Sequence, residues 1–131
     1  MSTLSVGTIK SNTSAPPVIQ NTSGTEIGTY CRAWVNFNGS TATNPASMTG
    51  VRGSFNVSSV LDNGTGDQTV NFTTAMPDAN YAAVAGGSTP GTRSNQVGTK
   101  YNQSASSCQI FTYSPTGTLV DATEISLAIF R

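Results

Sequence analysis

The chain of 131 residues contains no histidine and few charged side chains, and these absences exclude several classes of function. Without histidine it lacks the side chain that most often acts as a base near neutral pH and as a zinc ligand. Only 9% of the residues are charged, the formal net charge is zero, and the basic residues are scattered along the chain. A nucleic-acid partner is therefore disfavoured, because neutralising phosphates requires a clustered basic surface.

Cysteine and long apolar runs are also scarce. Cys31 and Cys108 lie far apart with no CxxC spacing, which argues against a redox or zinc site. They predict two buried thiols; the alternative is one disulfide between strands, which would require an oxidising compartment. No run approaches the about 18 apolar residues that can span a bilayer, and no basic segment followed by an apolar core opens the chain. We therefore expect a soluble protein without membrane insertion or a classical export signal.

Small polar residues are abundant instead. Serine, threonine and asparagine supply 48 of the 131 residues, while hydrophobic residues make up 36%. This composition is typical of a strand-and-turn protein that hydroxyls and amides keep soluble. Because the core of a monomer would be thin and its edge strands are not guarded by lysine or proline, oligomerisation is expected, and a trimer is preferred.

The polar and apolar residues alternate over short segments separated by turn signals. Phe55 and Val57 alternate with polar neighbours, D-N-G-T-G-D at 62–67 supplies a turn, and Val70 and Phe72 resume the alternation, which predicts a β-hairpin. Further strands are predicted at 33–37, with Trp34 directed away from the core, and at 81–85, 108–113 and 124–131. Residues 40–50 and 86–107 are predicted to be long polar loops. The expected fold is all-β, an antiparallel sandwich or jelly-roll-like domain of six to eight strands.

Residues 1–29 differ from the remainder, so the predicted organisation is an N-terminal arm at 1–29 and a β-domain at 30–131. The arm holds short apolar pieces separated by polar segments and Pro16–Pro17, and it cannot form a core of its own. Two interpretations remain open, a disordered tail or an extended arm that pairs with neighbouring subunits or docks to a larger particle. The apolar residues that would make those contacts are Leu4, Val6, Ile9, Val18 and Ile19.

The sequence offers little for catalysis, and we predict no enzyme, no cofactor and no metal site. The carboxylates lie in or beside turns, and the closest pair, Asp62 and Asp67, flanks the Asn63–Gly66 turn. A glycosidase requires two carboxyl groups about 5–10 Å apart across one cleft. A calcium loop requires alternating oxygen ligands and a distal glutamate, which this turn lacks. Local hydrogen bonding within the turn is therefore the favoured role of both aspartates.

The segments A-W-V-N-F-N-G at 33–39 and R-G-S-F-N-V to D-A-N-Y at 52–81 resemble a module of tail-fibre-like virion proteins of tailed bacteriophages. The opening L-S-V-G-T-I-K-S-N-T-S-A-P-P-V-I resembles the arm that often precedes this module. The resemblance implies a homotrimer whose N-terminal arms attach to other virion proteins and whose β-domains face outward, with assembly in the host cytoplasm.

Three functions follow from this resemblance. The first is a short tail fibre or spike component that attaches to the host surface, with loops 40–50 and 86–107 displaying recognition residues. Tyr101, Asn102 and Gln103 are the candidate contacts to a host surface glycan, although they are also ordinary loop residues. The alternatives are a capsid decoration protein that stabilises the phage head and a glycan-degrading spike.

Overall fold

The computed structural model describes residues 5–12, 17–89 and 96–131, and it describes only the backbone of residues 96–101. The chain divides into two compact units, Met1–Tyr30 and Cys31–Arg131. In the described ranges the regular structure consists of strands and one short 3-10 turn, η1 (Gly39–Thr41), with no helix that could cross a membrane.

The N-terminal unit contains a small antiparallel hairpin of β1 (Ile19–Gln20) and β2 (Glu26–Gly28). The side chain of Asn21 holds the connecting turn, because its Oδ1 accepts hydrogen bonds from the backbone N–H groups of Ser23 and Thr25 at 3.0 and 2.9 Å. None of the described large apolar side chains of this unit is buried, and the exposed ones are Val6, Ile9, Val18, Ile19, Ile27 and Tyr30. Leu4 lies outside the described residues.

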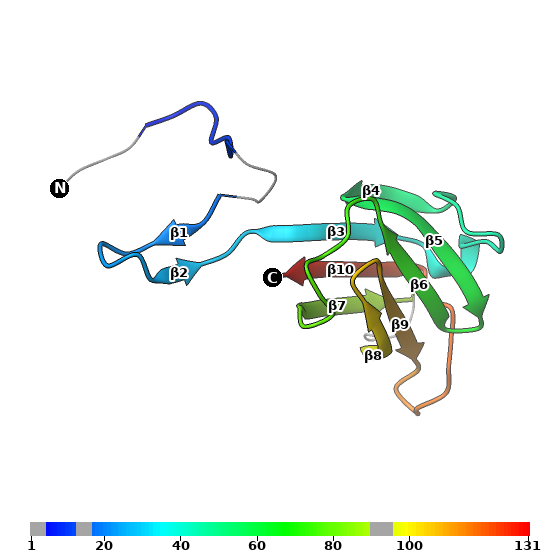
Figure 1. The fold of residues 1–131 in the computed structure, drawn as a ribbon. Coiled ribbons are helices and arrows are strands. Elements are labelled where there is room, and N and C mark those ends of the chain that lie inside the picture. The colour runs from blue at the N-terminus through cyan, green and yellow to red at the C-terminus, as the bar shows by residue number, and fades with distance from the viewer. Residues whose placement is uncertain (1–4, 13–16, 90–95) are drawn as a thin grey trace. The chain divides into compact units, whose positions relative to one another are not determined.

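The C-terminal unit is a sandwich of two four-stranded antiparallel sheets (Figure 1). The first sheet has the order β4-β3-β10-β7 and the second β5-β6-β9-β8. The prediction of an all-β antiparallel domain is confirmed. The strands are β3 (Cys31–Phe37), β4 (Val51–Phe55), β5 (Val57–Gly64), β6 (Asp67–Phe72), β7 (Ala82–Ser88), β8 (Gln96–Ser104), β9 (Ser107–Tyr113) and β10 (Glu124–Phe130).

The chain changes sheets at the edges of the sandwich. It runs from β4, an edge strand of the first sheet, into β5, an edge strand of the second, and it passes between the opposite edges from β7 to β8. Strand β10 then returns beside β7, so strands β7 to β10 follow the Greek-key order. This connectivity places β6 and β9 in the centre of the second sheet.

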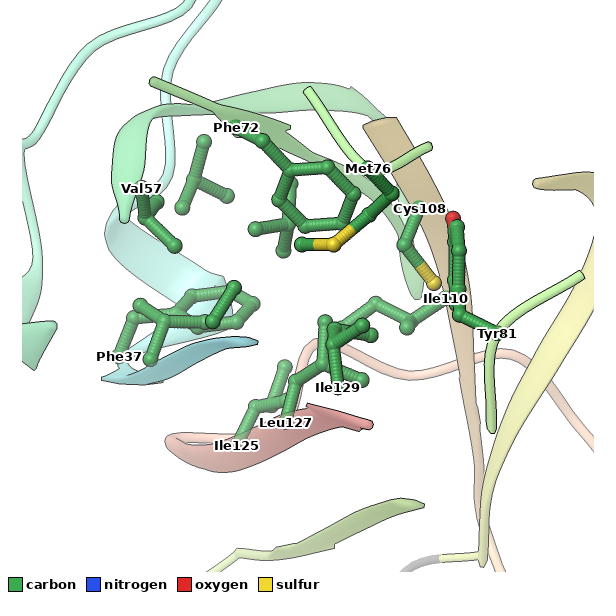
Figure 2. Packing of buried hydrophobic residues seen from close by; sticks show 14 of the residues in the cluster. Phe37, Val57, Phe72, Met76, Tyr81, Cys108, Ile110, Ile125, Leu127 and Ile129 are labelled. Atoms are coloured by element: carbon green, nitrogen blue, oxygen red, sulfur yellow. The ribbon is translucent and has the colours of Figure 1, made fainter. Parts of the chain in front are cut away.

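Alternating side chains from both sheets fill one apolar core (Figure 2). Figure 2 shows Phe37 of β3 and the β10 side chains on one side of the core, facing residues of the second sheet such as Phe72 and Ile110. Trp34 is 43% exposed, which confirms that it points away from the core. The buried apolar residues of this core are Ala33, Val35, Phe37, Val57, Val60, Val70, Phe72, Met76, Tyr81, Cys108, Ile110, Ala122, Ile125, Leu127 and Ile129.

Asn56 separates two strands that the sequence pattern joins into one. Phe55 and Val57 were predicted to share a face, but Phe55 is 56% exposed and Val57 is 8% exposed. The reason is the left-handed backbone of Asn56, whose φ is 55°, because it turns the chain from one sheet into the other. Its amide donates to the carbonyls of Arg32 and Thr74, both at 3.0 Å, and its Oδ1 accepts from the Thr74 N–H at 2.7 Å.

The predicted loop at 86–107 is wrong over most of its length. Strand β7 continues to Ser88, and Gln96–Ser104 forms β8, which pairs with β9. The end of β7 and strand β8 could not be predicted from the sequence pattern, because the glycine, serine and threonine residues in these segments give no apolar alternation. Residues 90–95 lie outside the described residues.

The loop at 40–50 protects an open sheet edge. Ser47 and Val60 exchange backbone hydrogen bonds of 3.0 and 2.7 Å, and Asp62 N–H donates to the Thr43 carbonyl at 3.0 Å. These bonds occupy backbone groups on the free side of β5, an edge that would otherwise be open to another strand. The edge that the sequence leaves without lysine or proline is therefore covered by the chain itself.

Replacement of Asn56 tests the sheet-to-sheet connection. Asn56→Ala removes three side-chain hydrogen bonds and retains a positive φ, so we expect the free energy of unfolding to fall by about 2–3 kcal/mol. Asn56→Gly loses the same bonds but relieves the backbone strain, and should be more stable than the alanine variant by about 1 kcal/mol. Guanidinium unfolding measures both, and an alanine variant as stable as the parent would contradict this role.

Candidate binding surface

A row of hydrogen-bonded polar side chains crosses the outer face of the second sheet. Asp67 Oδ1 accepts from Asn63 Nδ2 at 3.0 Å and from Gln109 Nε2 at 2.7 Å. Gln109 Oε1 in turn accepts from Asn102 Nδ2 at 2.6 Å. We call Asn63, Asp67, Gln109 and Asn102 the polar ladder. Its members come from β5, β6, β9 and β8, so it spans all the strands of this sheet.

Strand alternation places these side chains outside. Along β6 the buried residues alternate with less buried ones, so that Asp67, Thr69 and Asn71 face outward while their neighbours enter the core. Strand β9 follows the same pattern and pairs Thr69 with Gln109. Asn63 also donates to Thr69 Oγ1 at 2.9 Å, which fixes the orientation of its amide.

The turn before Asp67 is anchored by the segment that connects β9 to β10. Asp121 Oδ1 accepts a hydrogen bond from Gly66 N–H at 2.7 Å and a longer one from Gln68 Nε2 at 3.4 Å. Gly66 has a φ of +68°, and a Cβ on it would lie 2.7 Å from the Thr112 carbonyl oxygen. The turn therefore requires glycine for both conformation and space, and it holds Asp67 at a fixed position.

Two aromatic rings lie beside the ladder. Asp67 is paired in register with Phe111 of β9, and Phe111 and Tyr113 project from the same face of that strand. Their ring centroids are 6.4 Å apart with an interplanar angle of 24°. The face thus combines a carboxylate and amides with a partly exposed aromatic pair.

The structure brings some of the sequence-predicted site residues together and separates others. Asp67 and Asn102 belong to the ladder, whereas Gln103 is paired with Cys108 and lies outside it. The side chain of Tyr101 lies outside the described residues. Asp62 accepts from the Gly64 N–H at 2.9 Å, as a turn residue does. In the described ranges no three metal-ligating side chains are grouped.

Sequence reasoning missed Asn63 and Gln109. The available signal was polar alternation in predicted strands, with Asp67, Thr69 and Asn71 on one face of β6. That signal marks an outer face, but it does not show which side chains meet across strands. The cross-strand register, which sets those contacts, depends on long-range packing.

The outer face of the first sheet has the opposite character. Phe55 is paired in register with Trp34, Trp34 with Ala128, and Ala128 with Val84. We call these four residues the apolar row, and it also crosses a complete sheet. Phe55, Trp34 and Val84 are 56%, 43% and 61% exposed. Exposed apolar residues placed side by side are more informative than single ones, because they mark interaction surfaces.

The two cysteines are free thiols, so the disulfide alternative is not realised. Cys108 is buried, but Cys31 is only half-buried, which corrects the expectation that both are buried. Burial raises the pKa of the Cys108 thiol to about 11. Burial also raises the pKa of the neighbouring Tyr81 hydroxyl, which donates to the Ser107 carbonyl at 2.7 Å. Both groups are thus uncharged members of the core.

No protein-family model matches the chain, and comparison with curated proteins finds no significant match. Among solved structures the chain is similar to the crystal structure of the phiAB6 tailspike in complex with three-repeated oligosaccharides of Acinetobacter baumannii surface polysaccharide. The TM-score is 0.47 and the sequence identity is 18%. The match covers 98% of this chain and 30% of the tailspike chain. No family is assigned to the chain from this likeness.

Two glycines provide a matched test of the ladder turn. Gly66 and Gly117 both have left-handed φ, +68° and +85°, but only a Cβ at Gly66 would collide with backbone atoms of the described residues. We expect Gly66→Ala to lower the free energy of unfolding by about 1–3 kcal/mol more than Gly117→Ala. Chemical denaturation of the two variants measures this difference, and equal stabilities would show that the turn is not held as described.

Proposed function

We propose that this chain is a non-enzymatic tail component of a tailed bacteriophage that attaches to the host surface. The observation that carries the proposal is the polar ladder, a set of hydrogen-bonded side chains displayed across one face of a rigid β-sandwich. Such a surface offers fixed polar groups to a polar ligand, and little ordering is needed when the ligand binds. The resemblance of residues 33–39 and 52–81 to tail-fibre-like virion proteins supports the same interpretation.

The arrangement of the carboxylates favours binding over hydrolysis. The hydrogen-bond partners of Asp67 are two amides and not a second carboxyl group. The Asp121 carboxylate accepts a hydrogen bond from the backbone of the turn at Gly66. Asp78 forms an ion pair with Arg131 at 2.6 Å, and the guanidinium lowers the pKa of Asp78, whereas a catalytic acid requires a raised pKa. The glycan-degrading alternative remains testable, because it predicts oligosaccharide release from host polysaccharide.

The tail assignment can be tested on intact particles. Electron microscopy with an antibody to this chain should label the tail tip, and the labelled purified protein should coat host cells. Cells stripped of surface polysaccharide serve as the matched control and should lose the coating. Label at regular positions on the head would instead favour the capsid decoration alternative and contradict tail attachment.

We further infer that the chain associates with copies of itself, as a homotrimer. Two sets of apolar side chains are exposed to water, the apolar row on the first sheet and the apolar residues of Met1–Tyr30. Burying them against another copy would be favourable because of the hydrophobic effect. The row carries no charged residue, so burying it against another copy costs no ion desolvation. The N-terminal unit would also contact other virion proteins.

Light scattering tests this association. The expected mass is three times the 13.5 kDa of one chain, and Trp34→Ser should shift the protein toward monomer. Met48→Ser is a suitable control, because Met48 is also exposed but lies outside the apolar row. A parent protein that is monomeric at micromolar concentration would contradict self-association, and equal effects of the two substitutions would contradict the role of the row.

A further inference from the structure

The polar ladder leaves several acceptor oxygens available to a ligand. Asp67 uses Oδ1 for both of its hydrogen bonds, and its Oδ2 accepts none from the part of the chain that the structure describes. The Oδ1 atoms of Asn63 and Asn102 are equally open within that part, since each residue uses only its Nδ2. The ladder therefore presents acceptors whose positions are fixed by the bonds that their own side chains donate or accept.

The acceptor set suits hydroxyl donors better than a metal ion. Calcium takes about 6–8 oxygen ligands, and magnesium requires near-octahedral geometry. The ladder supplies one free carboxylate oxygen on β6, one open amide oxygen on the neighbouring β5 and another on β8, which β9 separates from β6. Vicinal hydroxyl groups of a sugar can donate to the Asp67 carboxylate and the Asn63 oxygen, and a bond to a carboxylate is stronger than one between neutral groups.

The neighbouring rings supply the second part of a sugar site. Phe111 is opposite Asp67 in the register, and Tyr113 lies two residues further along the same face. The face of an aromatic ring carries partial negative charge and attracts the polarised C–H groups on the flat side of a pyranose. A sugar over these rings would have its hydroxyl edge directed toward the ladder.

We propose that the polar ladder and the Phe111–Tyr113 pair form a binding site for a neutral pyranose of a host surface glycan. This inference rests on the proposed attachment function and names its ligand class. Asp67 is the residue that selects the ligand, because its carboxylate accepts from vicinal hydroxyls and repels the carboxylate of a uronic acid.

Nuclear magnetic resonance provides a direct test, since the side-chain amides of Asn63, Asn102 and Gln109 give their own signals. The probes are glucose, galactose, mannose and rhamnose as neutral sugars, with glucuronate as the acidic comparison. At least one neutral sugar should shift the ladder amides and the Phe111 and Tyr113 ring signals, and glucuronate should shift them less. Absence of shifts with all four neutral sugars, or stronger binding of glucuronate, would overturn the proposal.

Asp67→Asn separates binding from folding. The asparagine oxygen can still accept from Asn63 and Gln109, while its NH₂ group replaces the open acceptor, so affinity should fall about tenfold or more. Asn71→Ala is the control, because Asn71 is on the same face of β6 but its side chain donates to Ser59 Oγ, which does not belong to the ladder. An Asp67→Asn protein that keeps the parent spectrum and the parent affinity would refute the site.

Cell binding distinguishes this inference from the attachment function. If labelled Asp67→Asn protein coats host cells as the parent does, attachment is retained and the ladder site is refuted. If the parent binds sugar at the ladder but does not coat cells, the sugar site is retained and the attachment function is refuted.

Discussion

The structure depends on burying one face of each of two amphipathic sheets against the other. The core is small and draws on every second residue of the central strands, as in β3, β9 and β10. A slip of one residue along β9 would expose Ile110 and bury Gln109 without partners, which would cost both apolar burial and polar solvation. The register is therefore strongly fixed, and with it the position of every side chain on the outer faces.

This constraint determines which residues lie on the outer faces, but it does not determine which types of side chain they carry. One carries the apolar row and the other the polar ladder, although both sheets contribute similar residues to the core. The core requires only that outward residues be tolerated in water, and serine or threonine at each position would suffice. The polar ladder, whose side chains bond across four strands, exceeds that requirement. The apolar row, which is aligned across the four strands of the other sheet, also exceeds it. The two faces therefore point to two separate interactions.

Much of the fold could be predicted from the sequence, because strong alternation at 33–37, 108–113 and 125–129 directly marks strands with one buried face. Strand β8 could not, since its glycine and polar residues gain their order from pairing with β9. The break at Asn56 was also hidden, because a single left-handed residue leaves the polar alternation unchanged. For the ladder, the sequence indicated Asp67 only as a turn residue and Asn102 as a candidate glycan contact within a loop. Their meeting across strands depends on register, which no local pattern encodes.

Under the proposed function, the two faces would act together in attachment. A single shallow site that contacts one sugar through a few hydrogen bonds binds weakly, because ordering the ligand offsets most of the contact energy. A surface polysaccharide repeats the same sugar many times, and self-association through the apolar row would repeat the ladder in each copy. Linked sites of this kind raise the effective affinity by about 10²–10⁴ without any new contact. Weak individual recognition is therefore compatible with firm attachment, provided that the apolar row holds the copies together.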